Sequence, residues 1–241
     1  MNIIQSILTQ NDCYKAGRKI TVKGLMLHSV GCPQPKASVF INQWNKSGIE
    51  KCVHGFIDAN TGDVHQTLPW NHRGWHGGGS CNNTHIGIEM CEPSTIKYTG
   101  GASFTDLNPT KTKETVLRTY NAAVELFAFL CEEFHLNPLT DIVSHSEGFR
   151  KGIASNHSDP EHLWKFYGLS MDSFREAVET RMLLGGGIVT PTTKTPYSAS
   201  EIVSAKNTVK TKAGLSDQTI EYLMKYQYGN DLIIKLAKAM K

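Results

Sequence analysis

Short apolar segments, separated by turn-forming residues, occur through the first part of the chain. Residues 25–27, 53–57 and 141–144 are each centred on apolar side chains. Segments of this length and character predict buried strands. The sequence Asn-Thr-Gly-Asp at residues 60–63 predicts a turn directly after the second of them.

Residues 85–90 alternate between apolar and other side chains. In a strand, this pattern places Ile86 and Ile88 on one face and Glu89 on the opposite face. A glutamate in such a setting has two interpretations. It is either an ordinary solvent-facing strand residue or a rigidly held general base.

Longer segments follow a helical period. Residues 38–46 are expected to be helical, and residues 116–134 keep apolar positions about 3.6 residues apart over their whole length. Ser170 is placed to cap a last helix that runs through Leu184. Together with the strands, these helices predict an α/β fold for the body of the chain.

A Gly triplet followed by a Thr- and Pro-rich segment marks a boundary between domains. Gly residues end helices, and Thr/Pro runs favour extended linkers. We therefore expect three parts: a body over residues 1–187, a linker over residues 188–197, and a small all-helical domain over residues 198–241.

The last domain is expected to contain three short helices. Ser198 and Glu201 form a capping-box pattern before the first of them. The second helix is expected to start at Ser216 or Asp217, and the third near Asn230 or Asp231. So small a bundle is near the lower limit of independent stability, which favours packing on the body or on another copy of the chain.

Composition excludes several classes of protein. The chain has 241 residues, of which 39% are hydrophobic and 20% charged, so it is neither disordered nor of low complexity. No apolar run approaches the ~20 residues that a membrane span needs. The first residues have no basic segment and no apolar stretch typical of a signal peptide. We expect synthesis in the cytoplasm and no membrane contact.

Charge is unevenly distributed. Residues 188–241 contain eight Lys, no Arg and four acidic residues, a net +4, whereas the whole chain carries +3. This asymmetry indicates either contact with an anionic partner or a solvated basic surface. Because the Lys residues are scattered and no recognition motif accompanies them, nucleic acid is not an expected partner.

The six cysteines show no Cys-x-x-Cys pair, so a four-thiolate zinc knuckle is not expected. Free thiols in a reducing compartment are the favoured interpretation, with a disulfide framework as the alternative.

Two histidines follow apolar strands at their carboxyl ends. These are His28 and His145, and Asp159 lies downstream of them. Polar residues at such strand ends are where open α/β sheets place ligands. Two neutral imidazoles and one carboxylate suit a hydrolytic Zn²⁺ site, which has three protein ligands and an open position for water. Structural roles for these histidines are the alternative.

Several motifs occur in one order along residues 20–183. They are Leu25-Met26-Leu27-His28-Ser29, Val53-His54-Gly55-Phe56-Ile57-Asp58, Gln66-Thr67-Leu68-Pro69, Gly74-Trp75-His76, Asn82-Asn83-Thr84-His85-Ile86-Gly87-Ile88-Glu89 and His145 followed by Asp159-Pro160. In this order they resemble the zinc-dependent N-acetylmuramoyl-L-alanine amidases of the type 2 amidase and peptidoglycan-recognition-protein superfamily, most of all clostridial phage and prophage endolysins. The resemblance implies a central mixed β-sheet flanked by helices.

The resemblance also implies roles for individual residues. It makes His28, His145 and Asp159 the Zn²⁺ ligands and Glu89 the catalytic glutamate. His157 occupies a position that is often Lys in the family and stabilises the oxyanion there. A histidine can donate the same hydrogen bond, but its charge depends on pH.

Five further residues fall in segments that the family places near the substrate groove. They are His54, Trp70, Trp75, His76 and Asn83. For the two tryptophans, core packing is an equal alternative.

The implied function is that of an endolysin, a bacteriolytic hydrolase that cleaves the amide bond between N-acetylmuramic acid and L-alanine of peptidoglycan. The alternatives are a non-catalytic peptidoglycan-recognition module and a bacterial autolysin of the same chemistry. The first is disfavoured because all three ligand positions are kept, and the second because an export signal is not seen. The basic helical domain is expected to bind anionic wall polymers or to form a homodimer.

Overall fold

The computed structural model describes residues 2–184, 197–224 and 229–240. The chain divides into two compact units, Met1–Ile188 and Val189–Lys241. The predicted linker over residues 188–197 lies outside the described residues except for Tyr197. Within the described part of the chain, no helix is both long and apolar enough to span a membrane.

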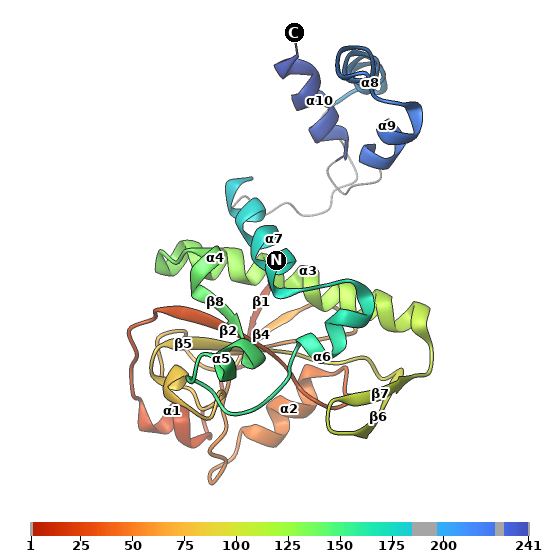
Figure 1. Ribbon diagram of the computed structural model, residues 1–241. Coiled ribbons are helices and arrows are strands. Elements are labelled where there is room, and N and C mark those ends of the chain that lie inside the picture. Colours follow the sequence, from red (N-terminus) through yellow and green to blue (C-terminus); the bar gives the residue numbers. More distant parts are fainter. Residues whose placement is uncertain (1, 185–196, 225–228, 241) are drawn as a thin grey trace. The chain divides into compact units, whose positions relative to one another are not determined.

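The first unit contains eight described strands (Figure 1). They are β1 Ile3–Gln5, β2 Gly24–Ser29, β3 Gly55–Ile57, β4 Val64–Gln66, β5 His85–Met90, β6 Ile96–Gly100, β7 Ser103–Asp106 and β8 Ile142–Ser144. Its α-helices are α1 Asp12–Ala16, α2 Ala37–Trp44, α3 Pro109–Phe134, α4 Pro138–Asp141, α5 His145–Arg150, α6 Glu161–Trp164 and α7 Met171–Leu183. Two 3₁₀ helices cover Ser80–Asn83 and Lys165–Tyr167.

Six of these strands form one mixed sheet in the order β1-β4-β3-β5-β2-β8. All neighbours in it are parallel except β3 and β4, which pair antiparallel. The predicted central mixed sheet is therefore confirmed. Strands β6 and β7 form a separate antiparallel hairpin.

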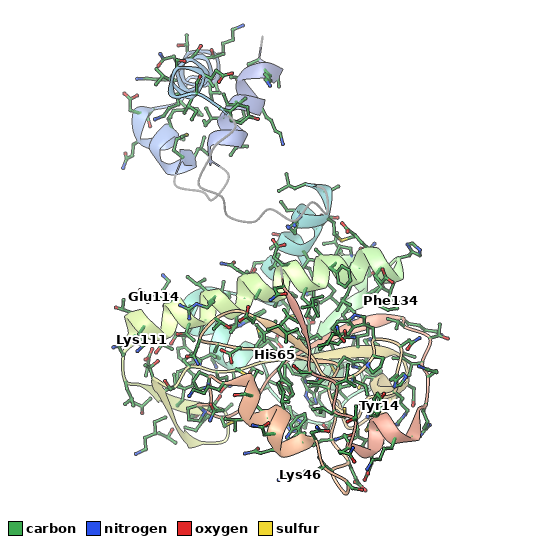
Figure 2. The ribbon with its side chains drawn as sticks, turned by 180° about the vertical axis from the view of Figure 1, so that it is seen from behind. Tyr14, Lys46, His65, Lys111, Glu114 and Phe134 are labelled. Atoms are coloured by element: carbon green, nitrogen blue, oxygen red, sulfur yellow. The ribbon has the colours of Figure 1, made fainter. Side chains whose placement is uncertain are left out.

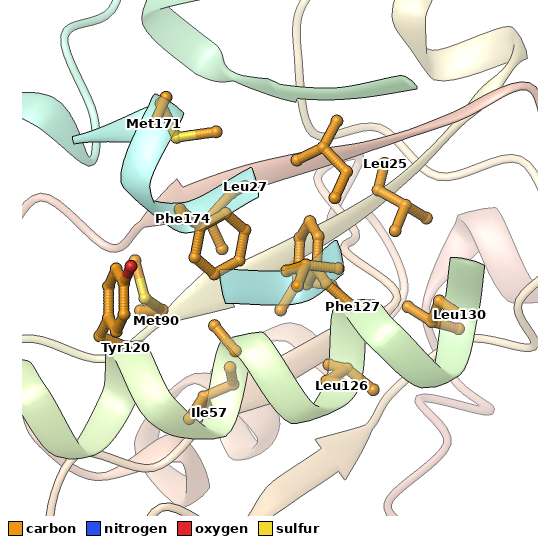
Figure 3. Close-up of a cluster of buried hydrophobic side chains, with 14 of the residues drawn as sticks. Leu25, Leu27, Ile57, Met90, Tyr120, Leu126, Phe127, Leu130, Met171 and Phe174 are labelled. Atoms are coloured by element: carbon orange, nitrogen blue, oxygen red, sulfur yellow. The ribbon is translucent and has the colours of Figure 1, made fainter. Parts of the chain in front are cut away.

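Helices α3 and α7 cover one face of the sheet (Figure 1). Their apolar side chains, such as Phe127 and Phe174, pack on Leu25 and Leu27 of β2 and on Ile88 of β5 in one continuous core (Figure 3). Because successive strand side chains point to opposite faces, this core takes the apolar half of β5 and leaves Glu89 on the other side.

Helix α2 packs on the opposite face of the sheet. Phe40 and Trp44 contact Phe56 of β3, with ring centroids 5.3 and 5.0 Å away. Cys52 and Val53 are buried in the same cluster. The sheet is thus covered on both faces, as α/β folds require.

Helix α3 begins at Pro109, seven residues before the predicted start at Val116. The side chain of Asn108 accepts a hydrogen bond from the Lys111 amide, and Pro109 suits the first helical turn. Polar residues such as Lys111 and Glu114 fill these first turns (Figure 2), so the apolar period did not reveal them.

Four short strands were not predicted from the sequence. Strands β1, β4, β6 and β7 have three to five residues each. Each holds only one or two apolar side chains, so none stands out as a buried apolar run. The predicted strand over residues 53–57 is shorter in the structure and begins at Gly55.

The second unit consists of α8 Ala199–Ala213, α9 Asp217–Met224 and α10 Gly229–Ala239. The three predicted helices are confirmed. The Ser198 hydroxyl accepts from the Glu201 amide, and the Glu201 carboxylate accepts from the Ser198 amide, which is the predicted capping box. Val209, Ile220 and Ile233 form a small core of their own.

Candidate functional site

A cavity of about 840 Å³ lies beside the carboxyl ends of the parallel strands β2 and β5. Ser29 and Glu89, at these strand ends, line it together with His145. His28 and Glu89 are register partners, so the sheet holds them side by side. The site therefore forms where open α/β sheets place their ligands.

Three ligand atoms converge at this cavity. His28 comes from β2, His145 begins α5 directly after β8, and Asp159 lies in the loop before α6. The Nδ1 atoms of the two histidines are 3.0 Å apart, and the Asp159 carboxylate oxygens lie 3.2 Å from one and 3.5 Å from the other. Among the residues that the structure describes, these three are the one group whose ligand atoms converge within 4.8 Å.

All three residues are buried. Burial lowers the pKa of His28, although Asp159 opposes this effect. Burial alone would raise the pKa of Asp159, but the adjacent rings of His145 and His28 hold it well below its usual range. A buried carboxylate that stays ionised beside two imidazole nitrogens favours a cation, so this group could bind a metal ion.

The protons on His28 are fixed by a chain of hydrogen bonds. Nε2 of His76 lies 3.1 Å from the His85 carbonyl, to which it can only donate. Nδ1 of a neutral His76 then accepts from Nε2 of His28, which is 3.0 Å away. The proton of His28 thus sits on Nε2, and its Nδ1 lone pair is free to bind a metal.

A second series of hydrogen bonds fixes the position of the proton on His145. Its Nε2 lies 3.2 Å from the hydroxyl oxygen of Ser155. That hydroxyl also lies 3.2 Å from the Gly77 carbonyl and 3.1 Å from Nδ1 of His157, either of which takes its one proton. Ser155 therefore accepts from Nε2 of His145 and leaves Nδ1 free. In both histidines, the hydrogen bond at Nε2 leaves Nδ1 free to bind a metal ion.

Gly87 is required by this arrangement. A Cβ atom on Gly87 would collide with the ring of His76. The Gly87 amide donates to Nδ1 of His54 at 3.0 Å, and Nε2 of His54 donates to the His72 carbonyl at 2.8 Å. The ring of His76 occupies the space that a Cβ atom on residue 87 would need, so this position of β5 requires glycine.

Glu89 lines the cavity, and its Oε2 atom is buried without a hydrogen-bond partner. Burial raises the pKa of Glu89 well above its usual value, with smaller effects from the nearby charges of Asp159 and Glu92. A solvent-facing strand glutamate does not have these properties. An unpartnered carboxylate beside a candidate metal site is a feature typical of catalytic sites.

The sequence patterns did not predict a buried hydrogen-bond network that lies beside the site. The Glu92 carboxylate accepts from the hydroxyls of Ser29 and Tyr98 at 2.7 Å each. The Tyr98 hydroxyl also lies 2.6 Å from Nε2 of His162 in α6. Glu92 thereby links the end of β2, which carries His28, with the helix that follows Asp159. A charged residue two positions after a buried strand was the available signal.

The five predicted groove residues divide into two groups. Trp75 and His76 line the cavity, and Trp75 is 44% exposed. The others are not among the lining residues. His54 is fully buried, Trp70 packs against the core under α3, and Asn83 is exposed and accepts from Arg73 at 2.7 Å. His157 lines the cavity, with its ring centroid 4.4 Å from that of His145.

Comparison with known proteins agrees with this geometry. The model of a family described as N-acetylmuramoyl-L-alanine amidase matches residues 17–162, which include all three candidate ligands and Glu89. No curated protein matches the chain.

Several solved structures share the fold. The hydrolase AmiA of Staphylococcus aureus is 17% identical, with 79% of this chain and 88% of that chain covered and a TM-score of 0.57. The catalytic domain of XlyA is 23% identical, with 74% and 99% covered and a TM-score of 0.51. PlyL is 16% identical, with 78% and 100% covered and a TM-score of 0.54. These likenesses concern the fold. Because the family match spans more than half of its residues, the chain belongs to the N-acetylmuramoyl-L-alanine amidase family.

Proposed function

We propose that the chain cleaves the amide bond between N-acetylmuramic acid and L-alanine with a zinc ion held by His28, His145 and Asp159. The observation that carries this proposal is the convergence of three ligand atoms within 4.8 Å, next to a buried carboxylate oxygen that has no partner. Two imidazole nitrogens and one carboxylate oxygen are a ligand set that hydrolytic zinc sites use.

The residues of the chain have distinct roles in this reaction. Bound zinc would supply Lewis acidity to water and to the scissile carbonyl. Glu89 takes the proton of the attacking water and later delivers it to the leaving amine of L-alanine. His157, on the cavity wall beside His145, donates a hydrogen bond to the oxygen that becomes negative.

The family is distinguished from other peptidoglycan hydrolases by its product. Digestion of purified cell walls is expected to release new α-amino groups on alanine and no new reducing sugar ends. End-group labelling followed by mass spectrometry of the fragments measures both. Reducing ends without new alanine amines would show that a glycosidic bond is cleaved and would refute the proposal.

We further propose that the second unit raises the concentration of the enzyme at the wall, either by contacting anionic wall polymers or by pairing two copies. Its net charge of +4 suits the first role. The second role needs apolar side chains on the surface of the unit, and Val203 and Leu232 are 56% and 37% exposed.

Truncation after residue 187 is expected to leave cleavage of a soluble muropeptide unchanged and to weaken lysis of intact walls. All candidate catalytic residues precede the cut, and every one lies in the first unit. Turbidity loss of walls and cleavage of the small substrate are measured side by side. A truncated chain that is insoluble, or that loses metal, would show that the second unit is needed by the catalytic one.

The two roles differ in their response to salt. Contact through exposed Lys residues should weaken as salt rises, because such charges are screened beyond about 8 Å at physiological ionic strength. Pairing through Val203 and Leu232 should survive salt and double the mass in solution.

A further inference from the structure

One wall of the catalytic cavity carries a basic side chain, that of Lys51. Among the described residues that line this cavity of about 840 Å³, no other is a Lys or Arg. Val53, two residues further on, also lines the cavity, and the segment leads into β3, which pairs with the strand β5 that carries Glu89. The lysine therefore borders the same space as the candidate metal group and the proposed base.

Two features of the fold hold Lys51 at this position. Its ammonium nitrogen lies 4.9 Å from the centroid of the Trp44 ring, and Trp44 itself lines the cavity. The side-chain amide of Asn11, which is fully buried, donates to the carbonyls of Trp44 at 2.9 Å and of Lys51 at 3.1 Å. One buried amide thus fixes the backbone of both residues, and the aromatic ring attracts the ammonium group.

The ammonium group of Lys51 has no acidic partner in the part of the chain that the structure describes. The ion pairs found there involve other basic residues, and no carboxylate oxygen lies at ion-pair distance from the Lys51 nitrogen. A few polar or charged groups on a cavity wall determine which ligand the cavity takes. An unpaired ammonium group at this place therefore favours a ligand that carries a carboxylate.

The chemistry of the cleaved bond indicates which part of the substrate carries that carboxylate. In the amide that joins N-acetylmuramic acid to L-alanine, the carboxyl group of the sugar acid is consumed by the bond itself. The N-acetyl group of the sugar is neutral. The peptide that begins with L-alanine still has free carboxyl groups, at least at its end. A carboxylate that binds in this cavity therefore comes from the peptide side of the bond.

We propose that Lys51 determines specificity by binding a carboxylate of the stem peptide, a role that rests on the amide cleavage proposed above. Its ammonium group donates a charge-assisted hydrogen bond to that carboxylate, while the Trp44 ring keeps the side chain in place. Because the contact lies away from the reacting atoms, it is equally strong before and during the reaction. It should therefore lower KM for peptides with the free carboxylate and leave kcat unchanged.

The test compares muramoyl peptides of one length whose carboxyl groups are either free or amidated, with the full-length protein. Wild type should have a kcat/KM about tenfold higher for the free form, mostly through KM. Substrates amidated at one carboxyl group at a time identify which carboxylate is bound. Raising the salt concentration should reduce the preference, because Lys51 is exposed and its charge is screened.

Three variants separate the charge of the side chain from its packing. Lys51→Met keeps an aliphatic side chain beside Trp44 and should lose the preference, with kcat/KM for the amidated peptide unchanged. Lys51→Arg keeps the positive charge and should retain most of the preference. Lys46→Met, the matched control, removes an exposed lysine that does not line the cavity and should behave as wild type.

Binding is measured separately by calorimetry with Glu89→Gln protein, which is expected to bind the peptides with little turnover. The free peptide should bind about tenfold more tightly than the amidated one, and adding Lys51→Met should abolish the difference. Equal affinity for both peptides, or a Lys51→Met protein that weakens both equally, would overturn the role of Lys51. Equal affinity together with continued amide cleavage by wild type would overturn that role alone and leave the proposed function standing.

Discussion

A metal chelator is expected to abolish amide cleavage by the purified protein, and added zinc is expected to restore it. The expectation follows from the buried ligand set of His28, His145 and Asp159, whose free nitrogen lone pairs and ionised carboxylate face one point. A bound metal supplies several kcal/mol of transition-state stabilisation, so about 10³-fold or more of the rate should depend on it.

Replacing His28 by alanine should have the same effect without a chelator. Two remaining ligands do not hold a hydrolytic zinc well, so both metal content and activity should be lost. His65→Ala is a matched control, because His65 lies on β4, bonds to Ser6 and does not line the cavity. Metal content is measured on the folded protein by atomic spectrometry. A His28→Ala protein that keeps one zinc per chain, or wall cleavage that continues in chelator, would exclude this ligand set.

The elements that surround the site could be predicted because their patterns are long or buried on one side. Residues 85–90 alternate, and α3 keeps its period over most of its length. Each pattern identifies the side chains that pack into the core between α3 and the sheet. The side chains on the opposite face follow from it. The side of β5 that carries Glu89 was therefore available from the sequence.

The contacts that tune the site could not be predicted in this way. Ser155 meets His145 across a loop, and Glu92 meets Tyr98 and His162 from three separate segments. Such contacts depend on how loops return to the sheet, which no periodicity encodes. The same reason explains Trp70 and Asn83, which lie near the predicted groove in sequence but are not among the residues that line the cavity.

Glu89→Gln is expected to separate proton transfer from metal binding. The substitution keeps the size of the side chain and removes its ability to take a proton. Zinc content and wall binding should be unchanged, whereas kcat should fall by about 10²–10⁴, the usual contribution of a positioned acid–base group. Thermal stability should not decrease, because the replaced carboxylate has a buried oxygen without a partner in the folded protein.

Each of three measurements tests a different explanation for the effect of Glu89→Gln. Metal content by spectrometry tests whether Glu89 is a ligand, because loss of zinc equal to that of His28→Ala would make it one. Turnover of a soluble muropeptide tests whether it is the base, because a near-normal kcat would reduce Glu89 to a structural residue. The thermal transition tests whether any loss of rate comes from unfolding instead. Only a fall in kcat with zinc and stability retained agrees with a general base held on β5, opposite His28 in the register of the sheet.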